Sequence, residues 1–275
     1  MVKTFKGIDC FDNGIAVCIN LNTICNLKCP YCFNKGLAKT TSVFSDVMLK
    51  SIIDAASKYK GSIRFMIQGG EPLLYPKLGT VLEYMLTKDN CAEIEIYTNG
   101  TVEIPFVYNK VKVIFSLHPT ELKRTDKIDL FINNVNRYHG NCVVLVQMYQ
   151  TKKAIDIIDE ISHKILKPLI PNFIYTNGVV DRIKFHHYLN DVPVFLEDGA
   201  PVHYANAMKG FKGFTCNLCE FFINDKCDVF QACIGRVGNV LANPDVFKNV
   251  QISHICTHDE CPTPCLMNFL KYAKT

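Results

Sequence analysis

The chain has 275 residues, a formal net charge of +4 and 48% hydrophobic residues, which is enough apolar material for one large folded domain and excludes a disordered chain. It contains no tryptophan and no long basic run, so it lacks the footprint of a nucleic-acid-binding protein. The N-terminus is charged where a signal peptide needs an apolar core, and no apolar run reaches the roughly 18 residues of a membrane span. We therefore expect a cytoplasmic protein that binds neither nucleic acid nor membrane.

Short runs of β-branched and aromatic residues alternate with helical stretches from residue 14 to about residue 176. Strands are predicted over residues 14–21, 62–68, 92–98, 111–117, 142–148 and 172–176. Apolar residues at helical spacing predict helices over 45–59, from residue 78 onward, over 127–138 and over 154–165. The link 99–110 contains Pro105 and is too short for a helix. This alternation predicts an α/β fold with a parallel sheet, a partial (β/α)6 TIM-type barrel.

After about residue 200 the alternation fades, and glycine and cysteine become frequent. We interpret this part as a small Cys-rich C-terminal domain. The predicted boundaries are residues 1–205 for the barrel domain and residues 206–275 for the Cys-rich domain.

The fourteen cysteines indicate metal binding rather than disulfides, because thiols of a chain without export signals stay reduced. Three of them lie within residues 25–32 and seven within residues 216–265. We interpret the remaining four as ordinary buried residues; they are Cys10, Cys18, Cys91 and Cys142.

The first predicted strand is followed by CNLKCPYCFN, which places Cys25, Cys29 and Cys32 in one loop with the spacing C-x3-C-x2-C. Closed zinc or iron-sulfur sites take four protein ligands, so three ligands indicate a metal kept open for a substrate or cosubstrate. Reactive groups of βα barrels lie at the carboxyl ends of the strands, where this loop falls. A three-cysteine zinc loop is the alternative.

This spacing, with Tyr31 before the third cysteine, resembles the cluster motif of the radical S-adenosylmethionine (radical SAM) superfamily. The resemblance implies that the three cysteines bind a 4Fe-4S cluster and that S-adenosylmethionine (SAM) chelates the fourth iron. It also implies an enzyme that cleaves SAM reductively to methionine and a 5′-deoxyadenosyl radical, which abstracts a hydrogen atom from a substrate.

The second predicted strand ends in IQGGEPLL, and Gly-Gly-Glu-Pro at this place is the other sequence mark of the family. The resemblance implies that Gly69, Gly70 and Glu71 contact the amino group of SAM, since glycines allow close approach and an acidic residue suits an ammonium group. The strand ends YTNG and FSLHP resemble family segments that line the cavity, which implies cofactor binding by Asn99 and Ser116. No catalytic acid or base is assigned.

Residues 221–239 resemble the auxiliary-cluster region of the SPASM and Twitch radical SAM enzymes. The resemblance implies one or two auxiliary iron-sulfur clusters, and the candidate ligands are Cys216, Cys219, Cys227, Cys233, Cys256, Cys261 and Cys265. Two clusters with four ligands each need one ligand more than these cysteines supply, and His254 and His258 are candidate substitutes. One cluster plus a zinc site is the alternative.

The cysteine spacing after residue 215 also resembles the second-cluster region of the GTP 3′,8-cyclases. The chain ends NFLKYAKT, without the Gly-Gly tail of those enzymes, so we expect a different activity.

The expected substrate is a peptide or a small molecule, and the expected electron donor is a flavodoxin or a ferredoxin. Only about thirteen residues precede the first predicted strand, so work on a peptide would require a separate recognition partner. The rival hypothesis is a non-enzymatic iron-sulfur or zinc protein that senses redox state or carries electrons. It predicts four-cysteine sites only and gives no reason for the GGEP sequence.

Overall fold

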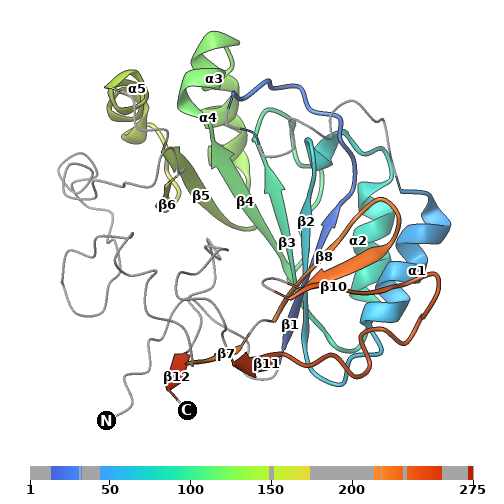
Figure 1. Cartoon of the computed structure of the whole chain (residues 1–275). Helices are drawn as coiled ribbons and strands as arrows, with labels where there is room; N and C mark the ends of the chain where they lie inside the picture. Colours follow the sequence, from blue (N-terminus) through green and yellow to red (C-terminus); the bar gives the residue numbers. More distant parts are fainter. Residues whose placement is uncertain are drawn as a thin grey trace.

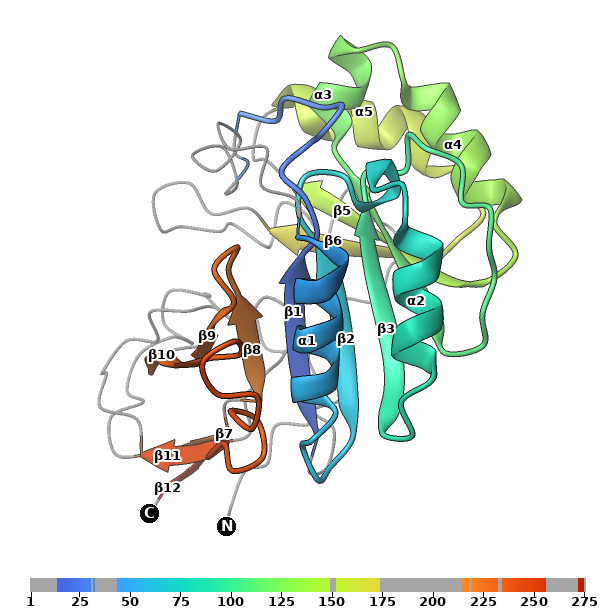
Figure 2. The same ribbon diagram turned by 90° about the vertical axis from the view of Figure 1, so that its right-hand side faces the viewer.

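The computed structural model describes residues 14–30, 32, 44–148, 152–173, 214–217, 219–231, 234–255 and 272–274. Its strands form a nine-stranded sheet in the order β10-β9-β8-β1-β2-β3-β4-β5-β6 and a separate three-stranded sheet in the order β11-β7-β12. Figure 1 shows the large sheet with its helices on the outer face, and Figure 2 shows the small sheet at the lower left of the large sheet. None of the described helices has the length and hydropathy needed to span a bilayer.

Six strands, neighbours in the large sheet and consecutive in the sequence, pair with one another in parallel. They are β1 (Ile15–Asn20), β2 (Ile63–Gln68), β3 (Cys91–Thr98), β4 (Val111–Leu117), β5 (Asn141–Met148) and β6 (Leu169–Phe173). The predicted α/β fold, a partial TIM-type barrel, is confirmed. The last strand begins three residues before the predicted range 172–176, and residues 174–176 lie outside the described part of the chain.

Among the described residues, four of the five α-helices follow the predicted apolar stripes: α1 (Asp46–Ala56), α2 (Leu78–Leu86), α4 (Ile128–Arg137) and α5 (Lys152–Ser162). Ser45 caps α1 by accepting the Met48 N–H, as an N-cap serine does. The sequence interpretation missed two short elements, the 3-10 helix η2 (Pro72–Leu74) and α3 (Pro119–Arg124). Both begin with proline a few residues after a strand ends, and neither is long enough to show an apolar period.

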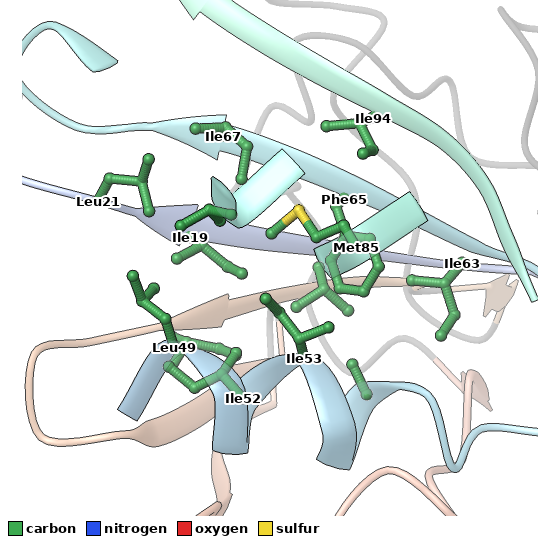
Figure 3. Close-up of a cluster of buried hydrophobic side chains, with 14 of the residues drawn as sticks. Ile19, Leu21, Leu49, Ile52, Ile53, Ile63, Phe65, Ile67, Met85 and Ile94 are labelled. Carbon is green, nitrogen blue, oxygen red and sulfur yellow. The ribbon is translucent and has the colours of Figure 1, made fainter. Parts of the chain in front are cut away.

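Alternate residues of the strands point toward the helix layer and form the core. Ile19 of β1, Leu21 just after it and Phe65 of β2 meet Ile53 of α1 and Met85 of α2 in one buried cluster (Figure 3). A second cluster joins β4 and β5 to α4 and α5. Burying each such side chain stabilises the fold by about 1.5–3 kcal/mol, so these two clusters fix the register that brings the strand ends together.

The C-terminal cysteine-rich segment continues the large sheet, which the sequence did not predict. It forms β7 (Phe214–Asn217), β8 (Glu220–Ile223), β9 (Asp228–Gln231), β10 (Gly235–Asn239), β11 (Ser253–Ile255) and β12 (Tyr272–Lys274). Strand β8 pairs with β1 in parallel, and Phe221 and Val229 join the core of the barrel. The predicted division into residues 1–205 and 206–275 stays a prediction, because residues 174–213 lie outside the described part.

Candidate functional site

The loop that carries the first cysteine group leaves β1 at the carboxyl end of the parallel strands. Cys25 is exposed, Cys29 and Cys32 are partly exposed, and the Cys32 N–H donates to the Cys29 carbonyl at 3.2 Å. Cys18 and Cys91, by contrast, are buried. Accessible thiols on a single loop fit the donor chemistry of an iron-sulfur cluster. Among the described residues, no three His, Cys, Asp or Glu side chains come close enough to hold a single metal ion.

A ring of polar side chains ties this loop to the end of β3. The Asn99 side-chain amide donates to Asn26 Oδ1 at 2.8 Å and lies 3.8 Å from Cys25 Sγ. The Asn26 amide donates to Thr101 Oγ1 at 2.8 Å, and the Thr101 hydroxyl donates to Asn99 Oδ1 at 2.6 Å. The ring therefore fixes the Asn99 amide beside the first cysteine. The sequence pointed to Asn99, but nothing in it identified Asn26 or Thr101.

Two hydrogen-bond donors lie beside the Cys25 sulfur. Desolvation by the surrounding chain raises the pKa of the Cys25 thiol, while the Leu27 N–H at 3.4 Å and the Asn99 amide act in the opposite direction. These donors point at the sulfur atom, so they favour its charged form once a metal has replaced the proton. The buried Leu27 side chain anchors the same loop in the second core cluster.

The two glycines after β2 allow the backbone to approach the start of the cysteine loop. The Gly70 N–H donates to the Asn22 carbonyl, and the Glu71 N–H donates to the Ile24 carbonyl, each at 2.7 Å. A Cβ atom at Gly69 would lie 2.4 Å from the Asn22 oxygen, and one at Gly70 would lie 2.1 Å from the Ile24 oxygen. Both contacts are too short for any side chain, so only glycine fits here.

The Glu71 carboxylate is fully buried beneath this junction. It accepts the Asn99 N–H at 2.7 Å, the Thr98 hydroxyl at 2.7 Å and the Leu73 N–H at 3.0 Å. Burial raises the pKa of Glu71, and the three donors oppose that shift. The structure thus places this carboxylate inside the protein, where it joins the ends of β2 and β3.

Ser116 and His118 lie at the end of β4. Phe115 and Leu117 pack into the helix-side cluster, so the partly buried Ser116 projects from the opposite face of the strand. Burial lowers the pKa of His118 to about 4, with Glu121 acting in the opposite direction, so the imidazole is neutral at pH 7.

The C-terminal cysteines divide between the two ends of β8. Cys219 precedes the strand and its carbonyl accepts the Ala16 N–H at 2.7 Å. Cys227 follows the turn at the other end, in a left-handed conformation with φ 61°, and its side chain is fully buried in the apolar core. The four residues of β8 span about 13 Å, so Cys219 and Cys227 lie at opposite ends of the sheet.

Cys216 lies in the small sheet, where its backbone is opposite His254 on one side and Tyr272 on the other. The other candidate ligands of the C-terminal group lie outside the described residues; they are Cys233, Cys256, Cys261 and Cys265.

Comparison with known proteins finds a family similarity over the strands β1 to β4. Residues 19–141, from β1 to the start of β5, match the family model described as the radical SAM superfamily. The probable GTP 3′,8-cyclase of Methanocella arvoryzae is 24% identical over 197 residues, covering 70% of this chain and 58% of that protein. The cysteine-type anaerobic sulfatase-maturating enzyme of Clostridium perfringens is 26% identical over 226 residues, covering 73% of this chain and 58% of that protein. The chain thus spans less than two thirds of these relatives.

Solved structures share the fold. The structure of native anSMEcpe with bound AdoMet and the Kp18Cys peptide is 18% identical, with a TM-score of 0.56 over 86% of this chain and 81% of that chain. Streptococcus suis SuiB bound to S-adenosylmethionine is 14% identical, with a TM-score of 0.54 over 87% of this chain and 66% of that chain.

Proposed function

We propose that this chain, which belongs to the radical SAM superfamily through its domain at residues 19–141, cleaves SAM reductively and abstracts a hydrogen atom from a substrate. The observation that carries the proposal is the loop of three accessible thiols at the carboxyl end of the parallel strands. A 4Fe-4S cluster bound there would supply a low-potential electron. Cys25, Cys29 and Cys32 would hold three of its irons and leave the fourth for SAM.

The residues around the loop set the geometry of that site. The Leu27 N–H and the Asn99 amide donate toward the Cys25 sulfur, and hydrogen bonds to cluster sulfurs are one determinant of reduction potential. Gly69 and Gly70 hold the start of the loop against β2. The Glu71 carboxylate holds the Asn99 backbone by accepting its N–H. Its complete burial favours a positioning role over direct contact with the SAM amino group.

Contacts with SAM itself are assigned to the polar groups at the strand ends. We keep Asn99 and Ser116, together with the backbone of Gly69 and Gly70, as candidates for this role. Each lies at the carboxyl end of β2, β3 or β4, where parallel strands of α/β proteins present ligand-binding groups.

The C-terminal segment is proposed to hold an auxiliary iron-sulfur cluster that accepts an electron from the substrate or binds the substrate through an open iron. Cys216 and Cys219 are the described candidates for its ligands. Both Cys219 and Cys227 are buried, but only Cys227 belongs to the apolar core cluster of the barrel. These surroundings favour a packing role for Cys227, because burial disfavours the thiolate that binds metal and raises the thiol pKa.

The substrate is proposed to be a peptide or a small molecule. Relatives support both classes, since one is named as a sulfatase-maturating enzyme, another is named as a probable GTP 3′,8-cyclase, and a structure of similar fold holds a peptide. A flavodoxin or a ferredoxin is the proposed electron donor.

Spectroscopy of the reconstituted protein tests the proposal against a redox carrier or a zinc protein. After anaerobic reconstitution with iron and sulfide, we expect a 4Fe-4S spectrum that changes when SAM is added. The Cys29→Ala variant should lose the SAM-sensitive signal, whereas Cys142→Ala, which changes a partly exposed thiol on β5, should keep it. A protein that binds zinc without iron, or a spectrum that ignores SAM, would contradict the proposal.

A further inference from the structure

The short helix α3 reaches the cysteine loop through one buried carboxylate. Glu121 Oε1 accepts the backbone N–H of Lys28 at 2.8 Å, across 93 residues of sequence. Lys28 directly precedes Cys29. The Glu121 side chain is only 3% exposed, so this hydrogen bond is shielded from water. A backbone donor held by a buried carboxylate is a strong anchor, because one partner is ionised.

Arg124, one turn further along α3, holds the carboxylate in a two-pronged contact. Its Nε donates to Glu121 Oε2 at 3.0 Å, and its second guanidinium nitrogen donates to Oε1 at 2.6 Å. These bonds, the Lys28 N–H and the Arg124 charge lower the pKa of Glu121, so the carboxylate is ionised at neutral pH. Since the Arg124 side chain is 58% exposed, the ion pair adds little stability by itself. Its effect is to orient the carboxylate.

The loop is fixed on both sides of this anchor. Leu27 packs into the second core cluster, Cys29 packs against the same cluster, and the Lys127 ammonium lies 3.5 Å from the Asn26 carbonyl. The three residues between the first two cysteines are therefore held at successive positions: Asn26 by Lys127, Leu27 by the second core cluster and Lys28 by Glu121. The Glu121 contact holds the backbone directly before Cys29.

We propose that Glu121 is a positioning residue for the iron-sulfur cluster: its carboxylate, oriented by Arg124, fixes the Lys28 amide and thereby the position of Cys29. The inference rests on the proposed cluster-binding function of the loop. Groups that orient metal ligands through hydrogen bonds commonly change metal affinity or activity by about 10- to 100-fold when they are removed. Glu121 makes this contact from an element that the metal-binding sequence motif does not include.

Three variants separate anchoring from general stability. Glu121→Ala removes the acceptor, and Glu121→Gln keeps an acceptor oxygen but loses the charge. Lys123→Ala is the matched control, because Lys123 lies on the same helix, is half exposed and pairs with Glu160 of α5 at 3.3 Å. Thermal unfolding of each variant shows whether the fold as a whole is retained.

The first readout is hydrogen exchange at the Lys28 amide in the protein without iron. We expect exchange about tenfold faster in Glu121→Ala, an intermediate rate in Glu121→Gln and no change in Lys123→Ala. The second readout is the rate at which a chelator removes iron from the reconstituted cluster. We expect it to rise about tenfold or more in Glu121→Ala, with partial rescue in Glu121→Gln, and the electron paramagnetic resonance signal of the reduced cluster should change.

The outcomes separate this inference from the proposed function. If Glu121→Ala and Glu121→Gln keep the wild-type exchange rate and the wild-type iron retention, the inference is wrong, while the wild-type cluster and its response to SAM still stand. If the wild-type protein forms no SAM-responsive cluster, the proposed function fails, and the exchange rate of Lys28 still decides whether Glu121 anchors the loop. Should Glu121→Ala not fold, Glu121→Gln compared with Lys123→Ala decides.

Discussion

The two cysteine groups of this chain look alike in sequence and differ in structure. Cys25, Cys29 and Cys32 lie on one loop, their thiols are exposed or partly exposed, and neighbouring side chains and amides hold that loop in place. Cys219 and Cys227 are also close in sequence, but β8 separates them and Cys227 lies in the apolar core. Closely spaced cysteines lie on one loop in the first group, whereas a strand runs between them in the second.

The direction of β8 gives this difference a consequence for function. Because β8 runs parallel to β1, Cys219 lies at the amino end of the sheet and the cysteine loop leaves at the carboxyl end. A cluster bound near Cys219 would thus be separated from the proposed SAM site by the length of β1, six residues or about 20 Å. The two metal sites would then flank the sheet at opposite ends.

The largest expected effect comes from removing a ligand of the loop. Cys29→Ala should reduce SAM cleavage below detection. The other two thiols on the described part of the loop, Cys25 and Cys32, already bind irons of the proposed cluster, so neither can replace the lost bond. Chromatographic measurement of methionine and deoxyadenosine checks this. If the Cys29→Ala variant still cleaves SAM, Cys29 is not an essential cluster ligand, and the proposed difference in function between the two cysteine groups is contradicted.

Substitution of Gly70, which lies between β2 and the cysteine loop, should have the next largest effect. Gly70→Ala places a Cβ atom 2.1 Å from the Ile24 carbonyl oxygen, and such overpacking costs about 1–3 kcal/mol. Thermal unfolding should show a fall of several degrees, together with loss of SAM binding. Gly79→Ala is the control, since a Cβ atom on that α2 residue meets nothing within 4 Å and alanine favours a helix. Equal melting temperatures for the two variants would contradict the account.

Alanine substitutions at Cys219 and Cys227, both in the C-terminal cysteine group, should have different effects. Cys219→Ala should lower the iron content of the reconstituted protein while sparing SAM cleavage without substrate. Cys227→Ala should keep the iron content and lower the free energy of unfolding by about 1 kcal/mol, because it deletes a buried sulfur. Iron analysis and denaturant unfolding of both variants check this. Loss of iron in Cys227→Ala would contradict this, because it would show that Cys227 binds metal as Cys219 does.

The smallest expected effect is a dependence of stability on pH at the carboxyl end of β4. His118 has a pKa of about 4 in the folded chain, below its ordinary value of 6.5, so the unfolded chain binds more protons between these values. The free energy of unfolding should therefore fall as pH is lowered from 6.5 toward 4. Thermal unfolding of wild-type protein and His118→Gln across this range checks it; identical pH profiles would show that His118 is not the cause.

Much of the fold could be predicted because the strands and long helices are periodic. The alternation of Ile15, Val17 and Ile19 and the stripe of α2 report burial directly. Helix α3 could not be found, since six residues show no period, and the pairing of β8 with β1 depends on a contact about two hundred residues apart. Sequence cannot reveal such contacts without relatives to compare.

One part of the candidate site could be predicted from the sequence and the other part could not. The three cysteines and the two glycines stand in recognisable patterns, because metal binding requires thiols at a set spacing and close backbone approach requires glycine. Glu121, Asn26 and Thr101 act through hydrogen bonds that form only when distant segments meet. Their roles become visible only in the folded chain.

The formation of 5′-deoxyadenosine tests the central claim most directly. Protein reconstituted anaerobically with iron and sulfide is mixed with SAM and a strong reductant, and the product is quantified by chromatography and mass spectrometry. The account predicts formation that depends on Cys25, Cys29 and Cys32 and persists in Cys142→Ala. Absence of the product from protein with a fully loaded cluster would contradict it and would favour an electron carrier.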